Sequence, residues 1–181
     1  MGRDHGRKGA DGMNVVIVSD SHGLTAELAQ IVSRHRHEAD LFIHCGDSEL
    51  PAEADELAPF VVVRGNCDWK AAFPDERIEE ADGVRFFVTH GHLYGVKTSL
   101  LRLYYRAKET EANVVCFGHS HLAGVEQING MLFINPGSIA LPRGRKEKTY
   151  AVLTIDKDQA FVQFYDVTGH PIPGLAQTFS F

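Results

Sequence analysis

The sequence predicts one α/β domain whose mixed sheet forms two layers, with helices on the outer faces. In the first half of the chain, apolar runs rich in β-branched residues alternate with an amphipathic segment. In the second half, pairs of short apolar runs flank Asp82-Gly83 and Asn129-Gly130, which are turn sequences typical of β-hairpins. No repeat, linker or change in composition divides the 181 residues. We therefore expect a single domain over residues 13–181.

Residues 1–12 are expected to lie outside this domain. They contain almost no apolar side chain, so they cannot contribute to a core and are expected to be disordered. Met13 is a sensible native start. The preceding segment is therefore interpreted as an artificial extension or as the product of an alternative start.

The first half alternates predicted strands and helices. Short apolar runs predict strands at residues 15–18, 41–45 and 60–63. Apolar residues at helical spacing predict an amphipathic helix over about residues 25–36. A short, acidic helical segment is expected after Pro51. Strands that alternate with helices pair in parallel through right-handed crossovers, so the first strands should be parallel.

The second half is dominated by predicted strands. A helix is expected over about residues 100–108, and the two turn sequences each join a pair of strands. The strands predicted in this half are residues 77–81, 84–89, 114–117, 124–128, 131–134, 149–155 and 160–166.

Composition excludes several classes of protein. The formal net charge of −6 argues against non-specific nucleic-acid binding, which needs a basic surface. No apolar run approaches the ~20 residues of a membrane span, and the run at residues 15–18 is too short for the core of a signal peptide. Three cysteines without CxxC spacing make a poor disulfide framework. We therefore expect a cytoplasmic protein that does not bind membranes.

Side chains that could bind a metal follow five of the predicted strands, at the point where each strand ends. They are Asp20, His22, Asp47, Asn66, His90, His119 and His121. Sites in open α/β sheets form just outside the carboxyl ends of strands. One such residue alone is more often a loop cap or a satisfied polar group. Independent capping would not place so many oxygen and imidazole ligands at strand ends, so we expect them to converge on one centre.

The size of this set indicates two metal ions. Two aspartates, one asparagine and four histidines are too many ligands for one zinc, which takes four. They suit two ions that share one carboxylate. Two cations about 3.5–4 Å apart stabilise both the attacking and the leaving oxygen in phosphoryl displacement. Thiolate-free ligands fit Mn, Fe, Ni, Zn or Co, and we expect two divalent ions per chain, with Mn the first choice.

The order of these residues identifies a family. Residues 13–168 resemble the calcineurin-like metallophosphoesterases, and most closely their small, single-domain bacterial and archaeal phosphodiesterases. The blocks that carry the resemblance are Asp20-x-His22, Gly46-Asp47, Gly65-Asn66-Cys67-Asp68, Thr89-His90-Gly91-His92, Gly118-His119-Ser120-His121 and Asn135-Pro136-Gly137-Ser138. The resemblance implies a four-layer α-β-β-α fold, with two sheets packed face to face between helices. It also implies hydrolysis of a small phosphoester, most readily a phosphodiester.

The resemblance also implies how the ligands are shared. The first metal would be held by Asp20, His22 and His121, and the second by Asn66, His90 and His119, with Asp47 bridging the two. Spacing alone leaves His90 and His92 open as ligands; the family pattern favours His90. His92 would then face the substrate or support a ligand. Asp68 is expected to orient a neighbouring ligand, and the turn at residues 135–138 is implied to support the ligand loops.

The implied reaction begins with a hydroxide that bridges the metals and attacks phosphorus in line, while Asn66 offsets charge on the equatorial oxygens. In the wider superfamily, a His that can protonate the leaving oxygen follows the Gly-Asn pair, and here Cys67 takes its place. A thiol of pKa about 8.5 matches neutral-pH acid catalysis less well than an imidazole of about 6.5. We hypothesise a preference for good leaving groups, such as aryl or nucleotide phosphodiesters. Alternatively, water or His92 supplies the proton, or Cys67 only fills the loop.

Two other functions stay open at this point. The same family includes a membrane-trafficking scaffold that keeps the fold and some ligands, and Cys67 in the acid position leaves a non-catalytic interaction scaffold as the alternative. A single structural metal site is the third reading. Trp69 and Phe73 are expected to anchor their loop to the core rather than to floor a substrate pocket. Whether the chain forms a homo-oligomer is not decided by the sequence.

Overall fold

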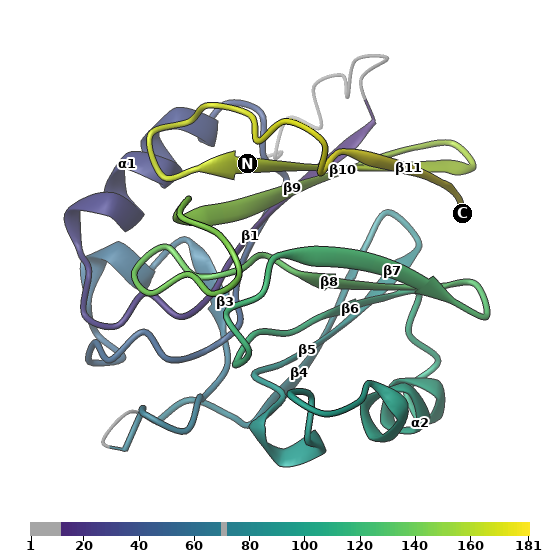
Figure 1. Cartoon of the computed structure of the whole chain (residues 1–181), viewed down its shortest axis with the longest axis horizontal. Coiled ribbons are helices and arrows are strands. Elements are labelled where there is room, and N and C mark those ends of the chain that lie inside the picture. Colours follow the sequence, from purple (N-terminus) through teal and green to yellow (C-terminus); the bar gives the residue numbers. More distant parts are fainter. Residues whose placement is uncertain (1–11, 70–71) are drawn as a thin grey trace, which may run out of the picture.

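The computed structural model describes residues 12–69 and 72–181, and its strands form two sheets packed face to face (Figure 1). The strands of the six-stranded sheet are, in spatial order, β11 (Gln177–Ser180), β10 (Gln159–Asp166), β9 (Thr149–Asp156), β1 (Met13–Val18), β2 (Leu41–His44) and β3 (Phe60–Val62). Those of the five-stranded sheet are β4 (Glu76–Ala81), β5 (Val84–Thr89), β6 (Val114–Cys116), β8 (Met131–Asn135) and β7 (Gly124–Ile128). The expectation of disorder for the amino-terminal segment concerns residues that lie, except for Gly12, outside the described part.

Both sheets are mixed, as the sequence predicts. In the first sheet β1, β2 and β3 are parallel, and β9 runs antiparallel to β1. In the second sheet β5, β6 and β8 are parallel, while the two edge strands β4 and β7 are antiparallel to their neighbours. The sequence analysis did not predict β11, which contains one large apolar residue, Phe179. Its backbone pairing with β10, rather than a hydrophobic pattern, makes it a strand.

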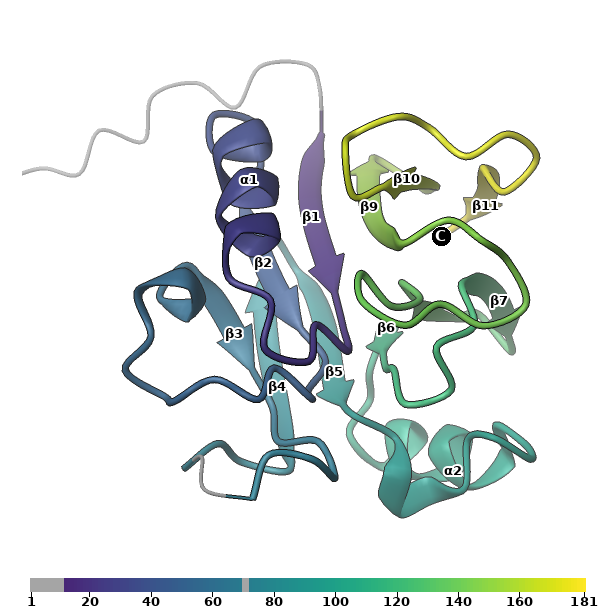
Figure 2. The same cartoon turned by 60° about the vertical axis from the view of Figure 1, so that its left-hand side comes forward.

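The two helices cover the outer faces of the sheets. Figure 2 shows α1 (Ala26–His35) on the outer side of β1 and β2, and α2 (Leu101–Glu109) beyond the other sheet. Two short 3₁₀ helices complete the helical structure of the described residues: η1 (Asp55–Leu57) and η2 (His92–Tyr94). The order helix, sheet, sheet, helix is the four-layer architecture implied by the resemblance, and that expectation is confirmed.

Alternation along each strand divides the core into three layers. In β1, Val15 and Ile17 pack between the sheets, whereas Val16 and Val18 pack against α1. Phe86 of β5 likewise faces the layer between the sheets, and the next residue, Phe87, packs against α2. Because both faces of the central strands are covered, these strands are continuously apolar, which is why the sequence reveals them.

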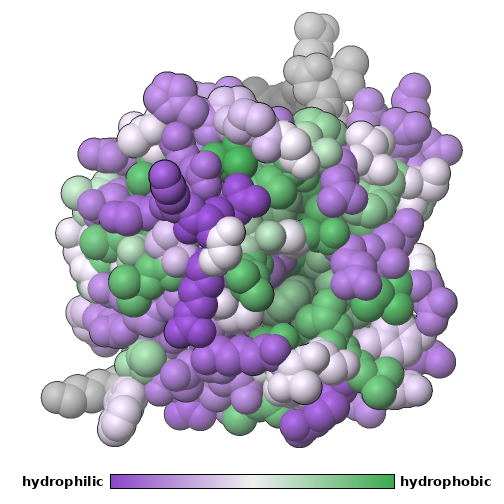
Figure 3. Space-filling view, in the orientation of Figure 1, coloured by the Kyte–Doolittle hydropathy of each residue, from purple (hydrophilic) through white to green (hydrophobic). Residues whose placement is uncertain are grey.

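Among the described residues, no helix is both long and apolar enough to cross a bilayer. Figure 3 shows polar and hydrophobic side chains mixed on one face, with hydrophobic ones gathered toward the middle of the view, where the two sheets of Figure 1 meet.

The loops that follow the parallel strands of both sheets meet at one end of the sandwich. Within the first sheet, the Asp20 amide after β1 donates to the Gly46 carbonyl after β2 at 3.0 Å. Within the second, the Gly118 amide after β6 donates to the His90 carbonyl after β5 at 3.0 Å. The His119 amide crosses between the sheets and donates to Asp20 Oδ2 at 3.1 Å. The fold therefore brings the carboxyl ends of strands from both sheets to one place.

His44, the last residue of β2, connects two of these loops from a completely buried position. Its Nδ1 accepts a hydrogen bond from the Gly46 amide at 3.1 Å, so the ring hydrogen lies on Nε2, which donates to Ser21 Oγ at 2.8 Å. Burial lowers the pKa of this imidazole to about 4. His44 is therefore a neutral structural link at pH 7.

The low pKa of His44 predicts how its contribution to stability changes with pH. The unfolded chain binds a proton at His44 near pH 6.5, whereas the folded chain binds it only near pH 4. The free energy of unfolding attributable to His44 is therefore complete above pH 6.5 and falls by about 3 kcal/mol as pH drops through that window. We expect His44→Gln to cost about 1–2 kcal/mol at pH 7.5 from the disturbed hydrogen bonds.

The measurement is urea unfolding of the wild type and His44→Gln in EDTA between pH 7.5 and pH 4.5. The other titrating groups are common to both proteins, so they cancel in the difference. The stability gap should narrow or reverse as the pH falls. A gap that stays constant over this range would contradict a neutral, buried His44.

Candidate metal centre

The carboxylate of Asp20 lies at the middle of the converging loops and is completely buried. One of its oxygens, Oδ2, accepts hydrogen bonds from Ser19 Oγ at 2.6 Å and from the His119 amide at 3.1 Å. The other, Oδ1, faces three imidazole nitrogens and has no hydrogen-bond partner in the described part of the chain. The distances are 3.1 Å to His121 Nε2, 3.7 Å to His90 Nε2 and 3.8 Å to His22 Nε2.

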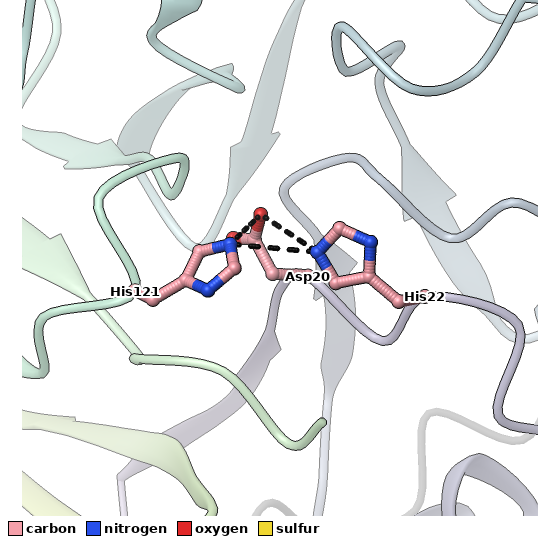
Figure 4. Close-up of side chains that lie close together, drawn as sticks. All are labelled: Asp20, His22 and His121. Atoms are coloured by element: carbon pink, nitrogen blue, oxygen red, sulfur yellow. Dashed lines mark hydrogen bonds and ion pairs between the residues drawn. The ribbon is translucent and has the colours of Figure 1, made fainter. Parts of the chain in front are cut away.

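Figure 4 shows two of these imidazoles approaching the Asp20 carboxylate from opposite sides, His22 from the loop after β1 and His121 from the loop after β6. Their Nε2 atoms are 3.4 Å apart. A buried carboxylate oxygen with two imidazole nitrogens turned toward it is a donor set that suits a divalent cation.

All three imidazoles are oriented by a hydrogen bond on the far side of the ring. In each case Nδ1 donates to an oxygen, which directs Nε2 toward the centre. The acceptors are Glu49 Oε1 for His22 at 2.5 Å, the Cys45 carbonyl for His90 at 2.7 Å and the Leu141 carbonyl for His121 at 2.6 Å. Histidine ligands of metals characteristically have such an outer partner.

Asp47 and Asn66 extend the centre away from His121. Asp47 Oδ2 lies 3.2 Å from His90 Nε2, and Asn66 Oδ1 lies 3.0 Å from the same nitrogen. The other oxygen of Asp47 accepts the Cys67 amide at 2.8 Å. Three overlapping sets of side chains have ligand atoms within 4.8 Å of one another: Asp20, His22 and His121; Asp20, Asp47 and His90; and His22, Asp47 and Cys67. The described residues therefore offer adjoining positions for a cation.

Two of the histidines singled out from the sequence lie at the edge of this centre. His119 belongs to none of the close sets; its ring centroid is 5.1 Å from that of His90. Burial, together with the charges of His90 and Lys97, lowers the pKa of His119 to about 4, which leaves its imidazole neutral. The His92 ring lies 5.4 Å from that of His90, and its Nδ1 is buried without a hydrogen-bond partner among the described residues. Sequence spacing left both His90 and His92 open as metal ligands. Of these two histidines, His90 is the one that lies beside Asp47.

The loops reach this arrangement through left-handed backbone. Five of the candidate ligands have positive φ angles: Asp20 at 53°, His22 at 43°, Asp47 at 57°, His119 at 70° and His121 at 60°. Residues other than glycine rarely adopt such angles, although Asp and His tolerate them better than most. Each such residue costs free energy, and clusters of them are typical of functional sites.

Two glycines allow the loops to approach one another. A Cβ on Gly118 would lie 2.0 Å from Ser19 Oγ, and a Cβ on Gly65 would lie 2.0 Å from Asp47 Oδ1. Neither contact could be accommodated, because both oxygens belong to side chains that hold the centre in place. Close packing around Asp20 and Asp47 thus explains why residues 65 and 118 are glycines.

Charges within the centre reinforce one another. Burial alone would raise the pKa of the Asp20 carboxyl, but the contact with His121 and the charge of His90 lower it. Burial alone would also lower the pKa of His90, yet its contacts with Asp47 and Asp20 raise it. The contact with Asp20 raises the pKa of His121. The carboxylates thus stay ionised and attract positive charge to this point.

Asp68 and Cys67 lie beside Asp47 in different roles. Asp68 is buried, and its carboxylate accepts three backbone amides, those of Asp47, Gly65 and Glu49, at 2.8, 2.7 and 2.9 Å. It therefore holds the Asp47 loop against the Asn66 loop.

Burial and the neighbouring carboxylates of Asp47 and Glu49 raise the pKa of the Cys67 thiol to about 11. Cys67 is thus a thiol rather than a thiolate at neutral pH.

The turn at residues 135–138 supports the ligand loops from behind. Asn135 Nδ2 donates to Ser120 Oγ at 2.9 Å and to the Gly118 carbonyl at 3.3 Å. Ser138 Oγ donates to the Asp20 carbonyl at 2.7 Å and accepts the Leu141 amide at 2.8 Å. Leu141 in turn provides the carbonyl that orients His121. One turn thereby fixes the loops that carry Asp20 and His121.

Two features escaped the sequence analysis. Glu49 orients His22, and only its place two residues after Asp47 could have suggested this. The expectation that Trp69 anchors its loop to the core is wrong: the side chain is 86% exposed and lines two surface cavities instead of packing in the core. Phe73 does pack against the core layer beneath α1.

Comparison with known proteins agrees with this geometry. Residues 13–158 match the calcineurin-like phosphoesterase superfamily domain. The chain is 55% identical to the probable metallophosphoesterase YsnB of Bacillus subtilis, over 90% of this chain and 96% of that protein. It is 32% identical to the phosphodiesterase YfcE of Escherichia coli, over 60% of each chain.

A solved structure shows the same fold. The crystal structure of a conserved uncharacterized protein of Streptococcus pneumoniae, a predicted phosphoesterase, superimposes with a TM-score of 0.90 at 34% sequence identity, covering 93% of this chain and 98% of that one. Similarity in sequence, in fold and in the order of the strand-end residues leads to one assignment. The chain belongs to the calcineurin-like phosphoesterase superfamily.

Proposed function

We propose that this protein is a metal-dependent phosphodiesterase that hydrolyses a small phosphoester with two divalent ions bound side by side. The observation that carries the proposal is the buried Asp20 Oδ1, around which three imidazoles direct Nε2 atoms while Asp47 lies next to one of them. Two carboxylates in one buried site are stabilised by positive charge between them. Divalent cations supply that charge.

The two ions would be held by different sets of ligands. Asp20, His22 and His121 would hold the first, and Asn66, His90 and His119 the second, with Asp47 shared between them. The close set of Asp20, His22 and His121 supports the first assignment. The contacts of His90 with Asp47 and Asn66 support the second, and His119 enters it on the family resemblance. We propose Mn as the metal, with Fe, Ni, Zn and Co also suited to these ligands.

When bound, such a pair of ions supplies an activated water for attack on phosphorus and positive charge for the phosphoryl oxygens. The residues of the chain position the ester around them. The Asn66 side chain is exposed beside His90, and its amide group can donate to a phosphoryl oxygen. His92 lines the same cavity as Asn66, and no described residue gives its Nδ1 a hydrogen bond.

Cys67 limits how the leaving group can be protonated. With a pKa of about 11 the thiol keeps its hydrogen at neutral pH, so it does not serve as a thiolate nucleophile and is a weak general acid. Hydrolysis would therefore favour esters whose alcohol leaves without protonation. Aryl phosphodiesters have this property, and we propose them as good substrates.

Removing the proposed bridging ligand tests the two-metal function. We expect Asp47→Asn to lower kcat/KM for bis(p-nitrophenyl) phosphate with Mn²⁺ by about 10³-fold or more, since the charge that joins both ions is lost. Mn²⁺ bound per chain, measured by equilibrium dialysis, should fall from two. Asp55→Asn, which removes an exposed carboxylate in η1, is the matched control and should change neither quantity.

An unchanged kcat/KM in Asp47→Asn would contradict the proposed mechanism. Absence of hydrolysis by the wild type with each of the five metals would instead favour the scaffold function. One bound ion per chain, with unfolding on chelation, would favour a structural metal site.

Restoring an imidazole at position 67 tests the role of the leaving group. We expect Cys67→His to raise kcat/KM for alkyl phosphodiesters at least tenfold more than for aryl ones, because only poor leaving groups need a general acid. Cys67→Ser, which adds no such acid, is the control. Steady-state rates on methyl p-nitrophenyl and dimethyl phosphate provide the comparison. Equal gains on both would show that the missing acid does not limit the enzyme.

A further inference from the structure

The loop between β8 and β9 carries a basic segment. Within this loop, residues 143–148 contain one acidic side chain, Glu147, and four basic ones: Arg143, Arg145, Lys146 and Lys148. Arg145 pairs with Glu147 at 3.6 Å. The other three basic side chains are exposed, and within the described part of the chain they make no ion pair. The segment therefore presents positive charge that no carboxylate of the described residues neutralises.

Two backbone contacts hold this loop against His121. The Leu141 carbonyl accepts a hydrogen bond from His121 Nδ1 at 2.6 Å, and the Arg143 amide donates to the His121 carbonyl at 3.1 Å. A Cβ on Gly144 would lie 3.1 Å from Leu122 Cδ2, so the loop also passes close to the residue after His121. Arg143 is thus tied to one of the ligand loops of the candidate centre.

The guanidinium of Arg143 lies within electrostatic reach of the His121 imidazole. The contact with Asp20 raises the pKa of His121, and the positive charge of Arg143 opposes that shift. Arg143 therefore places an exposed, unpaired cation at the edge of the candidate centre.

A second exposed cation lies near the other histidine of the same loop. Lys97, between η2 and α2, makes no ion pair with a described residue. Burial and the charge of His90 lower the pKa of His119, and the charge of Lys97 adds to that shift. Val96 and Leu100, on either side of Lys97 in the chain, line a cavity of about 330 Å³ together with Leu122.

Leu122 therefore adjoins both segments that carry these cations. Its side chain is 51% exposed, and it contacts the cavity beside Lys97 as well as the loop of Arg143. Lys97 and Arg143 thus flank one short loop, which holds His119 and His121 and continues into an exposed apolar residue.

This arrangement suits an anionic group of a substrate. The two proposed ions would take the phosphoryl group that is cleaved, which leaves Arg143 and Lys97 for another part of the same molecule. Arginine binds phosphate through two parallel hydrogen bonds, and lysine binds it as a point charge. Unpaired cations beside a site also raise the local concentration of anionic ligands.

We propose that Arg143 and Lys97 bind a second phosphoryl group of the substrate, so that the preferred substrates are phosphodiesters that carry a further phosphate. This inference rests on the proposed phosphodiesterase function. In the reaction, the oxygen of water bonds to the phosphorus of the diester, the P–O bond to the leaving group breaks, and the bonding electrons leave with the departing oxygen. The second phosphate stays uncleaved and contributes binding only.

Two thymidine esters with the same leaving group isolate the effect of the second phosphate. Both are p-nitrophenyl esters of thymidine 5′-phosphate, and one of them carries an additional 3′-phosphate. With the wild type, equal free Mn²⁺ and low ionic strength, we expect kcat/KM for release of p-nitrophenolate to be about tenfold higher for the ester with the 3′-phosphate, mainly through KM. The ratio should fall toward one in Arg143→Gln and in Lys97→Gln. It should also fall in the wild type at about 1 M salt, which screens exposed charges.

The substitutions leave the fold and the proposed metal ligands in place. Both side chains are exposed, and the hydrogen bond of residue 143 to His121 is made by its backbone. Arg36→Gln is the matched control: it removes an exposed guanidinium that follows the carboxyl end of α1, the end away from the His22 loop, and should leave the ratio unchanged.

Equal kcat/KM for the two esters in the wild type, or a ratio that either Arg143→Gln or Lys97→Gln leaves unchanged, would overturn this inference and leave the phosphodiesterase function standing. No metal-dependent cleavage of either ester would overturn both.

Discussion

The buried carboxylate of Asp20 is the interaction on which the rest of this structure depends. Through its amide, its carbonyl and one side-chain oxygen, Asp20 contacts Gly46, Ser138 and His119, each in a loop that follows a different strand. These bonds join both sheets at one end of the sandwich. Among the described residues, they occupy every hydrogen-bonding group of Asp20 except Oδ1, which is directed at the imidazoles. The bonds that tie the loops together thus also leave one anionic oxygen available to a cation.

The loop conformations that leave Asp20 Oδ1 available are strained, and the packed core offsets the free energy of that strain. The loops adopt left-handed backbone at several acidic and histidine residues, and glycines must allow their close approach. Apolar strands covered on both faces, and buried polar links such as His44, supply the stabilising free energy that offsets this strain. The core thus supplies the rigidity with which ligands from separate loops keep a common geometry. The candidate ligands thus lie where left-handed backbone is concentrated.

Much of the fold and the centre could be predicted from the sequence, for identifiable reasons. Strands such as β1 are covered on both faces, so burial leaves a continuous apolar run, and the candidate ligands directly follow such runs. Other features depend on loop paths that no local pattern encodes. The contact of Glu49 with His22 joins two loops that are far apart in the sequence, and the exposure of Trp69 follows from no pattern around it. β11 exists through pairing with β10 rather than through its own hydrophobicity.

The central claim is that two ions share Asp47 at the meeting point of the two sheets. Anomalous diffraction from crystals grown with Mn²⁺ tests it most directly, because it locates the metal without reference to activity. The account predicts two peaks about 3.5–4 Å apart, one beside His121 and the other beside His90, with Asp47 in contact with both. A single peak, or peaks that Asp20 and Asp47 do not contact, would contradict it.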